Sequence, residues 1–240
     1  MQVTPYKDSE NQKKQQVEQM FDNIAPKYDF LNHFLSFGID KLWRRKAIRI
    51  LSTYNHQTIL DVASGTGDFA IEASKLKPSK IIGFDLSEQM LNVGREKVKR
   101  LGLDHLIEFR KGDSESMPFT DSQFDAIIVG FGVRNFENLD AGLGEFYRVL
   151  KPSGVVVILE FSKPKYFPMK QLYWLYSFGL LPLIGKLISK DKAAYSYLPE
   201  SVMAFPDDQK FLSILRNIGF VSASQKRLSF GISTIYIAQK

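Results

Sequence analysis

The segment ILDVASGTGDFA at residues 59–70 holds the densest set of residues that could do chemistry. Its first half is a predicted buried strand that ends at Asp61, and its second half starts a predicted helix. Gly65 and Gly67 lack a β-carbon and therefore let the backbone approach a ligand closely. The free N–H groups at the start of the helix attract a carboxylate or a phosphate. The segment predicts a site for a charged small molecule at the end of a strand.

Two more carboxylates follow predicted strands. Asp85, followed by Leu86, ends the second strand, and Asp113, followed by Ser114, ends the third. Asp85 can accept hydrogen bonds from ribose hydroxyls, and Asp113 can accept one from an adenine amino group. Together with the glycine loop, these four residues predict a nucleoside site.

The glycine loop by itself leaves two cofactor classes open. Residues 65–70 also fit the GxGxxA pattern of dinucleotide-binding proteins. Asp61 at the strand end would repel a pyrophosphate but attract an ammonium or sulfonium group. The loop GFGVRNF at 130–136 contains no recognisable hydride-transfer residues. A sulfonium methyl donor, S-adenosylmethionine, is therefore favoured, with a nicotinamide dinucleotide as the alternative.

The order of the predicted elements indicates an α/β fold. Short, almost continuously apolar strands alternate with helices, which is typical of a parallel sheet covered on both faces. Strands are predicted at 58–63, 80–85, 107–113, 124–130, 154–161, 221–228 and 232–239. Helices are predicted at 10–23, 40–52, 67–76, from the second strand to about 101, at 143–150 and at 208–220.

This pattern divides the chain into four segments. Residues 1–56 form an N-terminal helical segment, and residues 57–162 form the cofactor-binding α/β core. Residues 163–206 interrupt the alternation with the apolar run QLYWLYSFGLLPLIGKLI and are predicted to be an inserted helical cap. Residues 207–240 supply a helix and a strand hairpin that complete the core.

Composition excludes several kinds of site. The chain of 240 residues has no cysteine, so disulfides, thiolate metal sites and cysteine nucleophiles are excluded. His33, His56 and His105 show no metal-ligand spacing, and no metal is expected. The polar start carries no signal peptide, and no run of about 18 apolar residues predicts a spanning helix, so the cytoplasm is the expected location. The net charge of +6 favours acidic partners, either nucleic acid or an anionic membrane surface.

Long gapped motifs in the chain resemble those of one protein family. Residues 28–43 are similar to YDxMNxxxSxxxHxxW, with Leu31 in place of the methionine and Asp40 in place of the histidine. Residues 148–162 are similar to RVLKPGGxxxxxEFS, with Ser153 in place of a glycine.

A further motif joins FGVRNF at 131–136 to AYSYLPESVMAFP at 194–206 and is similar to FGxRN and YxYLxxSxxxFP. On these motifs the chain resembles the ubiquinone/menaquinone biosynthesis C-methyltransferase family from about Val17 to Ile237. The resemblance implies a class I S-adenosylmethionine-dependent methyltransferase fold, which is Rossmann-like with a seven-stranded, mostly parallel sheet. It also implies transfer of a methyl group to a ring carbon of a prenylated quinol.

The resemblance implies demethylmenaquinol as the substrate, converted to menaquinol in the last step of menaquinone biosynthesis. Methylation of 2-methoxy-6-polyprenyl-1,4-benzoquinol in ubiquinone biosynthesis is the alternative, because nothing in the residues distinguishes the two rings. The resemblance also assigns donor contacts to Thr66, Asp85, Asp113 and Ser114, and a backbone contact to Gly130.

Four residues form the predicted catalytic set. A ring carbon next to a hydroxyl is a weak nucleophile until that hydroxyl loses its proton, so a base or a phenolate-stabilising cation is expected. Arg134 stays protonated and is expected to stabilise the phenolate or orient a water molecule. Asn135 is expected to hold a ring oxygen, and Tyr195 and Tyr197 to line the ring pocket. The alternatives are an ion pair of Arg134 with a structural carboxylate and plain packing of the tyrosines; His33 is a weaker candidate for the base.

The apolar cap is predicted to bind the prenyl tail, because each buried CH₂ contributes about 0.8 kcal/mol. The expected channel residues are Tyr173, Trp174, Phe178, Leu180, Leu181, Leu183 and Leu187. Six lysines flank this stretch and suit an anionic membrane surface, namely Lys163, Lys165, Lys170, Lys186, Lys190 and Lys192. A self-packed helical hairpin with solvated lysines is the alternative.

Other functions stay open at this stage. The chain could methylate another small molecule or a lipid, or bind the donor without catalysis. Nucleic-acid methylation is not expected, because carbon-5 methylation of cytosine needs a cysteine and no Asn/Asp-Pro-Pro-aromatic turn follows the fourth strand. The oligomeric state is open, with a homodimer as one alternative.

Overall fold

A seven-stranded sheet forms the centre of the molecule in the computed structural model, which describes residues 3–180 and 193–240. The strand order is β3-β2-β1-β4-β5-β7-β6; β1 to β5 are parallel, and β7 runs antiparallel to both of its neighbours. The strands are β1 (Thr58–Val62), β2 (Lys80–Asp85), β3 (Ile107–Lys111), β4 (Phe124–Gly130), β5 (Leu150–Phe161), β6 (Val221–Leu228) and β7 (Ser233–Gln239). The predicted fold class is confirmed.

Most helices lie at the positions that periodicity predicts. The α-helices of the described ranges are α1 (Lys13–Ile24), α2 (Tyr28–Leu35), α3 (Ile39–Leu51), α4 (Asp68–Ala73), α5 (Glu88–Arg100), α6 (Leu139–Val149), α7 (Met169–Trp174), α9 (Ala193–Ala204) and α10 (Gln209–Ile218). Short helical turns are η1 (Ala25–Lys27), η2 (Ser74–Leu76), η3 (Val133–Asn135), the π-helical η4 (Leu175–Leu180) and η5 (Ser229–Gly231).

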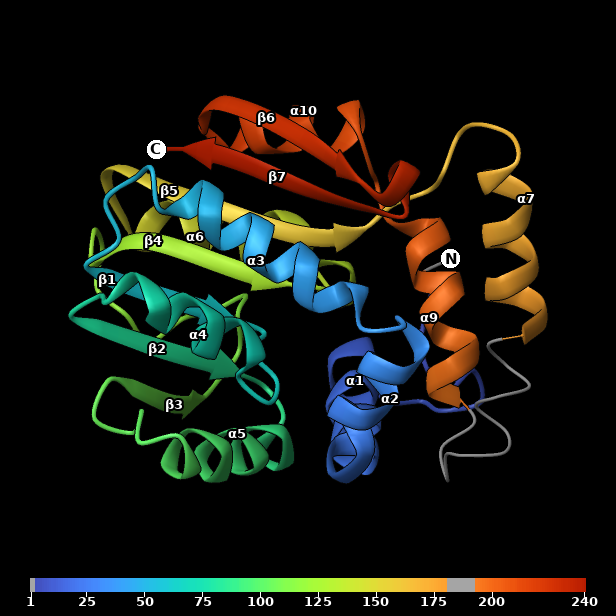
Figure 1. Cartoon of the computed structure of the whole chain (residues 1–240), viewed down its shortest axis with the longest axis horizontal. Coiled ribbons are helices and arrows are strands. Elements are labelled where there is room, and N and C mark those ends of the chain that lie inside the picture. Colours follow the sequence, from blue (N-terminus) through green and yellow to red (C-terminus); the bar gives the residue numbers. More distant parts are fainter. Residues whose placement is uncertain (1–2, 181–192) are drawn as a thin grey trace.

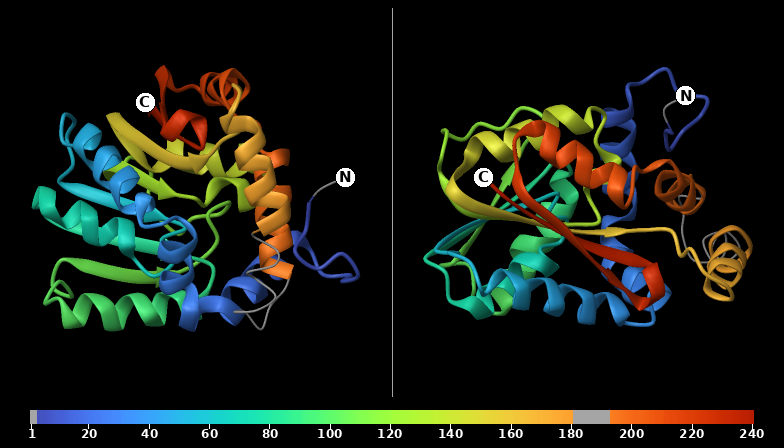
Figure 2. Two further views of the ribbon diagram at one scale, coloured as in Figure 1. Left: turned by 45° about the vertical axis from the view of Figure 1, so that its right-hand side comes forward. Right: turned by 90° about the horizontal axis from the view of Figure 1, so that it is seen from above.

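The sheet is covered on both faces. Strand side chains on one face of the sheet, such as those of Leu60 and Ile127, pack with the apolar faces of α6 and α10. Those on the other face, such as the side chains of Ile59 and Ile128, pack with α3, α4 and α5. Successive side chains of a strand point to opposite faces, so both faces need apolar residues and the strands read as continuous apolar runs. Figure 2 shows α6 and α10 on one side of the sheet and α3 on the other.

The N-terminal helices and α9 lie beyond the carboxyl ends of the parallel strands. In Figure 1 the arrowheads of β2, β3, β4 and β5 point toward α1, α2 and α9. A separate apolar cluster joins these helices through Val17 and Met20 of α1, Leu31 of α2, and Tyr195 and Tyr197 of α9. The strand order reverses between β1 and β4, which is where ligands bind in open α/β sheets.

The ring of Phe109 fixes the glycine loop against the sheet. A β-carbon built on Gly67 or on Gly83 would lie 2.5 Å from this ring, and one on Gly94 would lie 3.0 Å from it. Gly67 also has a positive φ of 80°, which favours glycine. Three glycines from the loop, from β2 and from α5 therefore make room for one buried aromatic side chain.

We expect Gly83→Ala to lower the free energy of unfolding by about 1–3 kcal/mol, because the added methyl overpacks this contact. In a Phe109→Leu background the same change should cost less, since the smaller side chain leaves room. Urea unfolding of the four proteins of this cycle measures both values. Gly144→Ala in α6 is the control, because its β-carbon would meet nothing within 4 Å. Equal penalties for Gly83→Ala in both backgrounds would contradict the packing argument.

Candidate active site

Three adjoining cavities lie at the carboxyl edge of the sheet. The inner cavity is bordered by the ends of β2, β3 and β4 and by α1. Its lining includes six of the nine predicted cofactor residues, namely Gly65, Asp85, Leu86, Asp113, Ser114 and Gly130. The structure thus brings together residues that lie up to 65 positions apart in the chain, as the crossover topology predicts.

Asp85 is held by backbone amides at the centre of this lining. Gly65 N–H donates to Oδ2 at 2.8 Å, and Ser87 N–H donates to Oδ1 at 2.8 Å. Burial raises the pKa of Asp85, while these amides oppose the shift. The carboxylate therefore ties the glycine loop to the end of β2, and its remaining lone pairs can accept from ligand hydroxyls.

Asp113 at the opposite end of the inner cavity is paired with the N-terminal helix. Lys14 Nζ lies 2.6 Å from Asp113 Oδ2 and 3.2 Å from Glu115 Oε2. Lys14, Glu18 and Phe21 of α1 all line the cavity. Sequence reasoning missed these α1 residues, because a polar helix far from the glycine loop carries no local signal of a ligand site.

Three of the predicted cofactor residues do not line the inner cavity. Asp61 is fully buried; its Oδ2 accepts from Ala70 N–H at 2.9 Å, and burial raises its pKa well above the usual range. Thr66 donates to Asp29 Oδ1 at 2.5 Å and accepts from Lys97 at 3.2 Å. Gly67 packs on the Phe109 ring. These residues support the loop from behind.

The loop after β4 carries the predicted Arg134 and Asn135. Arg134 Nη1 lies 2.9 Å from Glu160 Oε1 of β5, and its guanidinium carbon lies 5.4 Å from the centre of the Phe161 ring. Burial raises the pKa of the fully buried Glu160, and Arg134 opposes that shift. The ion pair with a structural carboxylate, which is the alternative given for Arg134, is present. Sequence reasoning left Glu160 out of the site, although it lies in a family motif.

Although Arg134 is paired with Glu160, it still borders the site. Arg134 lines the second, or middle, cavity, and its buried Nε has no hydrogen-bond partner among the described residues. A buried donor without a partner is costly and often awaits a ligand or a water molecule. Glu160 therefore fixes a guanidinium that still has a free donor.

The middle cavity lies between α1, α2, α9 and the loop after β4. Its lining consists of Met20, Phe21, Ile24, Tyr28, Leu31, Asn32, Leu35, Ser36, Asp40, Arg44, Phe131, Arg134, Phe161, Ala194, Tyr195, Tyr197 and Leu198. It shares Phe21, Tyr28 and Phe131 with the inner cavity. All four predicted catalytic residues border one of these two cavities.

Two tyrosines of the middle cavity are kept neutral by burial. Burial raises the pKa of Tyr197 to about 12 and also raises that of Tyr28. Tyr197 donates its hydroxyl hydrogen to Asn135 Oδ1 at 3.2 Å. This bond orients the Asn135 amide, whose side chain also borders the inner cavity. The tyrosines therefore act as neutral donors here and not as proton acceptors.

The outer cavity has a volume of about 610 Å³, within the usual range of small-molecule sites of about 300–1,000 Å³. It shares Asn32, Leu35, Ser36, Phe161 and Leu198 with the middle cavity. Leu42, Trp43, Met169, Leu172 and Tyr173 contribute further apolar wall. Of the predicted channel residues, Tyr173 lines it, while Trp174, Phe178 and Leu180 do not. Leu181, Leu183 and Leu187 lie outside the described residues, as do Lys186, Lys190 and Lys192.

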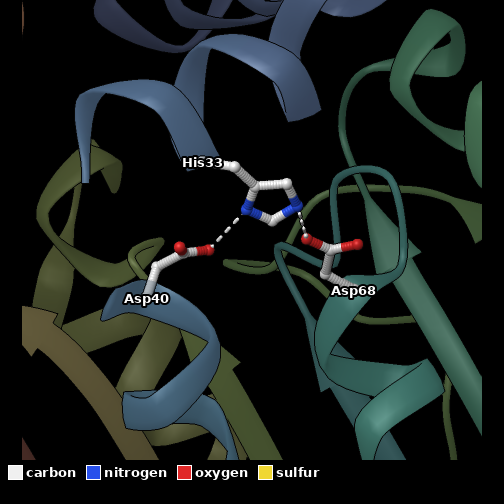
Figure 3. Close-up of side chains that lie close together, drawn as sticks. All are labelled: His33, Asp40 and Asp68. Carbon is white, nitrogen blue, oxygen red and sulfur yellow. Dashed lines mark hydrogen bonds and ion pairs between the residues drawn. The ribbon is translucent and has the colours of Figure 1, made fainter. Parts of the chain in front are cut away.

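A charged cluster joins the N-terminal helices to the glycine loop. His33 Nδ1 of α2 lies 2.9 Å from Asp40 Oδ2 of α3, and His33 Nε2 lies 3.5 Å from Asp68 Oδ2 of α4 (Figure 3). The chain spacing of the histidines gave no hint of this cluster, in which one imidazole and two carboxylates lie within 4.8 Å of one another. Arg44 contacts both carboxylates, and Lys97 contacts Asp68, so their charges are already balanced by protein cations.

The geometry suits a nucleoside with a cationic reactive centre. Asp85 ends β2, Asp113 lies two residues after the end of the neighbouring β3, and both border one cavity. The positive φ of Gly65, 54°, brings loop backbone to the wall of this cavity. Phe21, Tyr28 and Phe131 separate that cavity from the middle one, which contains a guanidinium, an amide and hydroxyl groups. A charged group on one side can thus meet an apolar, hydroxyl-bearing molecule on the other.

Comparison with solved structures agrees with the fold. A SAM-dependent methyltransferase from Thermotoga maritima has a TM-score of 0.65 at 20% identity, with 92% of this chain and 99% of that chain covered. A putative S-adenosyl-L-methionine-dependent methyltransferase from Methanococcus maripaludis has a TM-score of 0.64 at 21% identity, with 97% and 96% covered. At these identities the likeness concerns the fold alone.

Sequence relatives are much closer. The chain is 54% identical over 239 residues to the demethylmenaquinone methyltransferase of Bacteroides fragilis, covering 99% of this chain and 97% of the relative. It is 44% identical over 240 residues to the enzyme of that name from Porphyromonas gingivalis, covering 99% and 98%. It is also 44% identical to the ubiquinone/menaquinone biosynthesis C-methyltransferase of Geotalea daltonii, covering 95% and 98%.

A family model covers almost the whole chain as well. The ubiE/COQ5 methyltransferase family matches residues 9–240, and this range includes every segment that borders the three cavities. The resemblance inferred from the gapped motifs is confirmed. The chain belongs to the ubiE/COQ5 methyltransferase family.

Proposed function

We propose that the protein transfers a methyl group from S-adenosylmethionine to the ring of demethylmenaquinol and so forms menaquinol. The observation that carries this proposal is the continuity of the three cavities, which share walls in the order inner, middle, outer. The inner cavity with its carboxylates matches a donor, the small middle cavity with a few polar groups in a mostly apolar lining matches a quinol ring, and the large apolar outer cavity matches a prenyl tail. The naphthoquinol ring is preferred over a benzoquinol because relatives at 54% and 44% identity are demethylmenaquinone methyltransferases.

The inner cavity is the proposed donor site. Asp85 accepts from the ribose hydroxyls, Asp113 accepts from the adenine amino group, and Leu86 and Ser114 complete the wall. The bound donor supplies an electrophilic methyl group on a positively charged sulfur. Phe131 and Tyr28, which belong to both cavities, exclude water from the boundary where transfer takes place.

Arg134 is the proposed stabiliser of negative charge on the ring oxygen. Its guanidinium stays protonated, and Glu160 together with the Phe161 ring fixes its orientation. Asn135, oriented by Tyr197, holds a ring oxygen from the neighbouring position of the loop. Preorganised donors of this kind stabilise the transition state without reorganising during the reaction.

The surface around the outer cavity is the proposed membrane contact. Phe30 and Phe34 lie one turn apart on α2, Phe37 follows the end of that helix, and these residues are 63%, 51% and 88% exposed. Trp174 and Phe230 are also exposed. Phe37 lines the outer cavity, and Phe34 and Trp174 are next in the chain to its lining residues Leu35 and Tyr173. Within the described residues, no helix has the length and apolarity needed to cross a membrane.

The described lysines support the membrane proposal less than the exposed aromatic residues do. Of the three predicted lysines in the described ranges, Lys163, Lys165 and Lys170, the first two are paired with Asp207 and Asp208 respectively, so their charges are balanced within the protein. The expected absence of a nucleic-acid partner and the oligomeric state remain predictions, with a homodimer as one alternative.

The function is tested with purified protein, labelled S-adenosylmethionine and demethylmenaquinol with a short prenyl tail. We expect the quinol to gain one methyl group, detected by mass spectrometry, because the three cavities align donor and ring. The matching demethylated benzoquinol is the comparison substrate. Faster transfer to the benzoquinol would reverse the ring assignment, and donor binding without transfer to either would leave a non-catalytic donor-binding protein.

We expect Arg134→Lys to lower the rate of methyl transfer in a single turnover by about 10²–10³-fold. Lysine keeps the charge but loses the planar fork that Glu160 orients. Donor affinity, measured by calorimetry, should stay within about twofold, since Arg134 does not line the inner cavity. Arg49→Lys on the exposed side of α3 is the matched control. Parental rates for Arg134→Lys would exclude a catalytic role.

For the membrane contact, we expect Phe30→Ser to weaken flotation with vesicles of mixed neutral and anionic lipid by at least about tenfold. A phenylalanine buried in the bilayer contributes about 1.5–3 kcal/mol. Val221→Ser is the control, because Val221 is also well exposed, at 58%, but lies away from the outer cavity. Val221 starts β6, and it is the other end of this strand, at Leu228, that pairs with Ser233 next to the cavity residue Ile232. The membrane proposal fails if the unmodified protein does not float at low salt, or if both variants float equally well.

A further inference from the structure

Methylation of a quinol ring releases one proton, and the middle cavity has to dispose of it. The ring exchanges a C–H bond for a C–CH₃ bond, and the sulfonium becomes a neutral thioether, so one proton remains. The middle cavity is walled by buried side chains, among them Leu31, Tyr195 and Tyr197. A group at the cavity wall has to accept the proton, because bulk water does not reach such a site freely.

The groups already assigned to the reaction are poor acceptors. Arg134 is a permanent cation. Glu160 does not line the cavity, and its oxygens accept from Arg134 and from Phe161 N–H. Tyr28 and Tyr197 are neutral donors whose pKa burial raises.

Ser36 and Asp40 offer a better acceptor on the wall formed by α2 and α3. Both residues line the middle cavity. Ser36 Oγ donates to Asp40 Oδ1 at 2.6 Å, and Asp40 is only 4% exposed. Because Ser36 also borders the outer cavity, its hydroxyl lies where the chambers for ring and tail meet.

The carboxylate is held in its ionised form from the opposite side. Asp40 Oδ2 lies 2.5 Å from Arg44 Nη1 and 2.9 Å from His33 Nδ1. His33 is 26% exposed at its side chain and faces Asp68, which in turn contacts Arg44 and Lys97; Figure 3 shows His33 between the two carboxylates. One oxygen of Asp40 thus accepts a hydrogen bond from Ser36 on the cavity side, and its other oxygen contacts the partly solvated imidazole of His33.

We propose that Ser36 and Asp40 accept the hydroxyl proton of the quinol, and that His33 and Arg44 are positioning residues for the Asp40 carboxylate. This proposal rests on the placement of the ring in the middle cavity. The ring O–H bond breaks, its proton moves to Ser36 Oγ, and the proton of Ser36 moves to Asp40 Oδ1. The electron pair of the broken O–H bond forms the second bond of a carbonyl as a ring π-pair forms the new C–C bond and the methyl–sulfur pair passes to sulfur.

The remaining steps balance the reaction. The ring hydrogen on the methylated carbon moves to the carbonyl oxygen and restores the aromatic quinol. Asp40 then loses its proton to solvent on the side of His33, for a net release of one proton. A carboxylate is a sufficient base for this purpose, because the hydroxyl becomes strongly acidic as the ring gives electrons to the methyl group.

The test measures single-turnover methyl transfer to short-chain demethylmenaquinol across a pH series. Ser36→Ala and Asp40→Asn should transfer about 10²–10⁴-fold more slowly than the parent, while calorimetry should give unchanged donor affinity. The parent rate should fall toward acid as Asp40 becomes protonated, and Asp40→Asn should lose this acidic limb. His33→Gln should shift the limb without abolishing transfer, which a purely structural role would not do.

Ser52→Ala near the end of α3 is the matched control, because it removes a hydroxyl that is exposed. Loss of donor affinity in Asp40→Asn would show that this variant does not fold. Ser36→Ala removes only one oxygen atom, so it still tests the proposal in that case. Parental rate and pH profile in Ser36→Ala would overturn this proposal alone. Absence of transfer by the parent protein would overturn the proposed function, and the proposal with it.

Discussion

The docking of α1 onto the carboxyl edge of the sheet is the constraint on which the site depends. Lys13 Nζ donates to the carbonyl of Phe136 at 2.7 Å, and burial lowers the pKa of Lys13 to about 8. Lys14 pairs with Asp113, and Glu18 pairs with Lys111 at 2.7 Å. Groups at the ends of parallel strands lack partners within the sheet, so they bind a ligand or a covering helix. Here α1 supplies those partners and at the same time closes the inner cavity.

A physical difference between the two substrates explains the division into chambers. The donor is a charged nucleoside that needs carboxylates and amides, whereas a prenylated quinol is apolar except for its ring oxygens. Carboxylates beside a prenyl channel would be costly to desolvate. The fold separates them with an aromatic wall, so that Asp85 lies on one side and the polar groups around Arg134 lie on the other.

The rigid and the variable parts of the molecule have different tasks. Asp85, Glu160 and the Phe109 contact fix the loops that end β1, β2 and β4, and they belong to the sheet core. The chambers proposed for ring and tail are instead lined largely by α1, α2, α3, α7 and α9, and α3 also packs on one face of the sheet. Solved methyltransferases at about 20% identity share the fold. A shared fold does not fix the function, so substrate choice depends on the residues of each site.

The sequence by itself determined the sheet and the approximate positions of its strands, although β5 begins at Leu150, before its predicted start at 154, and β3 ends at Lys111, before its predicted end at 113. Period-two and continuous apolar runs are local properties of the sequence. The carboxyl ends of parallel strands must meet at one edge of the sheet, and this rule predicts that Asp85 lies close to Asp113. The gapped motifs carried the family. The glycine loop predicts cofactor contacts for Asp61 and Gly67, and the family resemblance implies one for Thr66; the structure places these residues against Ala70, Phe109 and Asp29 respectively.

Only the tertiary structure decided which distant groups neutralise one another. Lys14 meets Asp113 across 99 positions, Arg134 meets Glu160 across 26, and His33 lies between Asp40 and Asp68. Such pairs leave no periodicity in the chain, because an ion pair depends on the approach of two side chains and not on their spacing. The direction of a side chain in a loop or on a packed helix is set by its three-dimensional neighbours, which is why the walls of the middle and outer cavities could not be read from the residues in order.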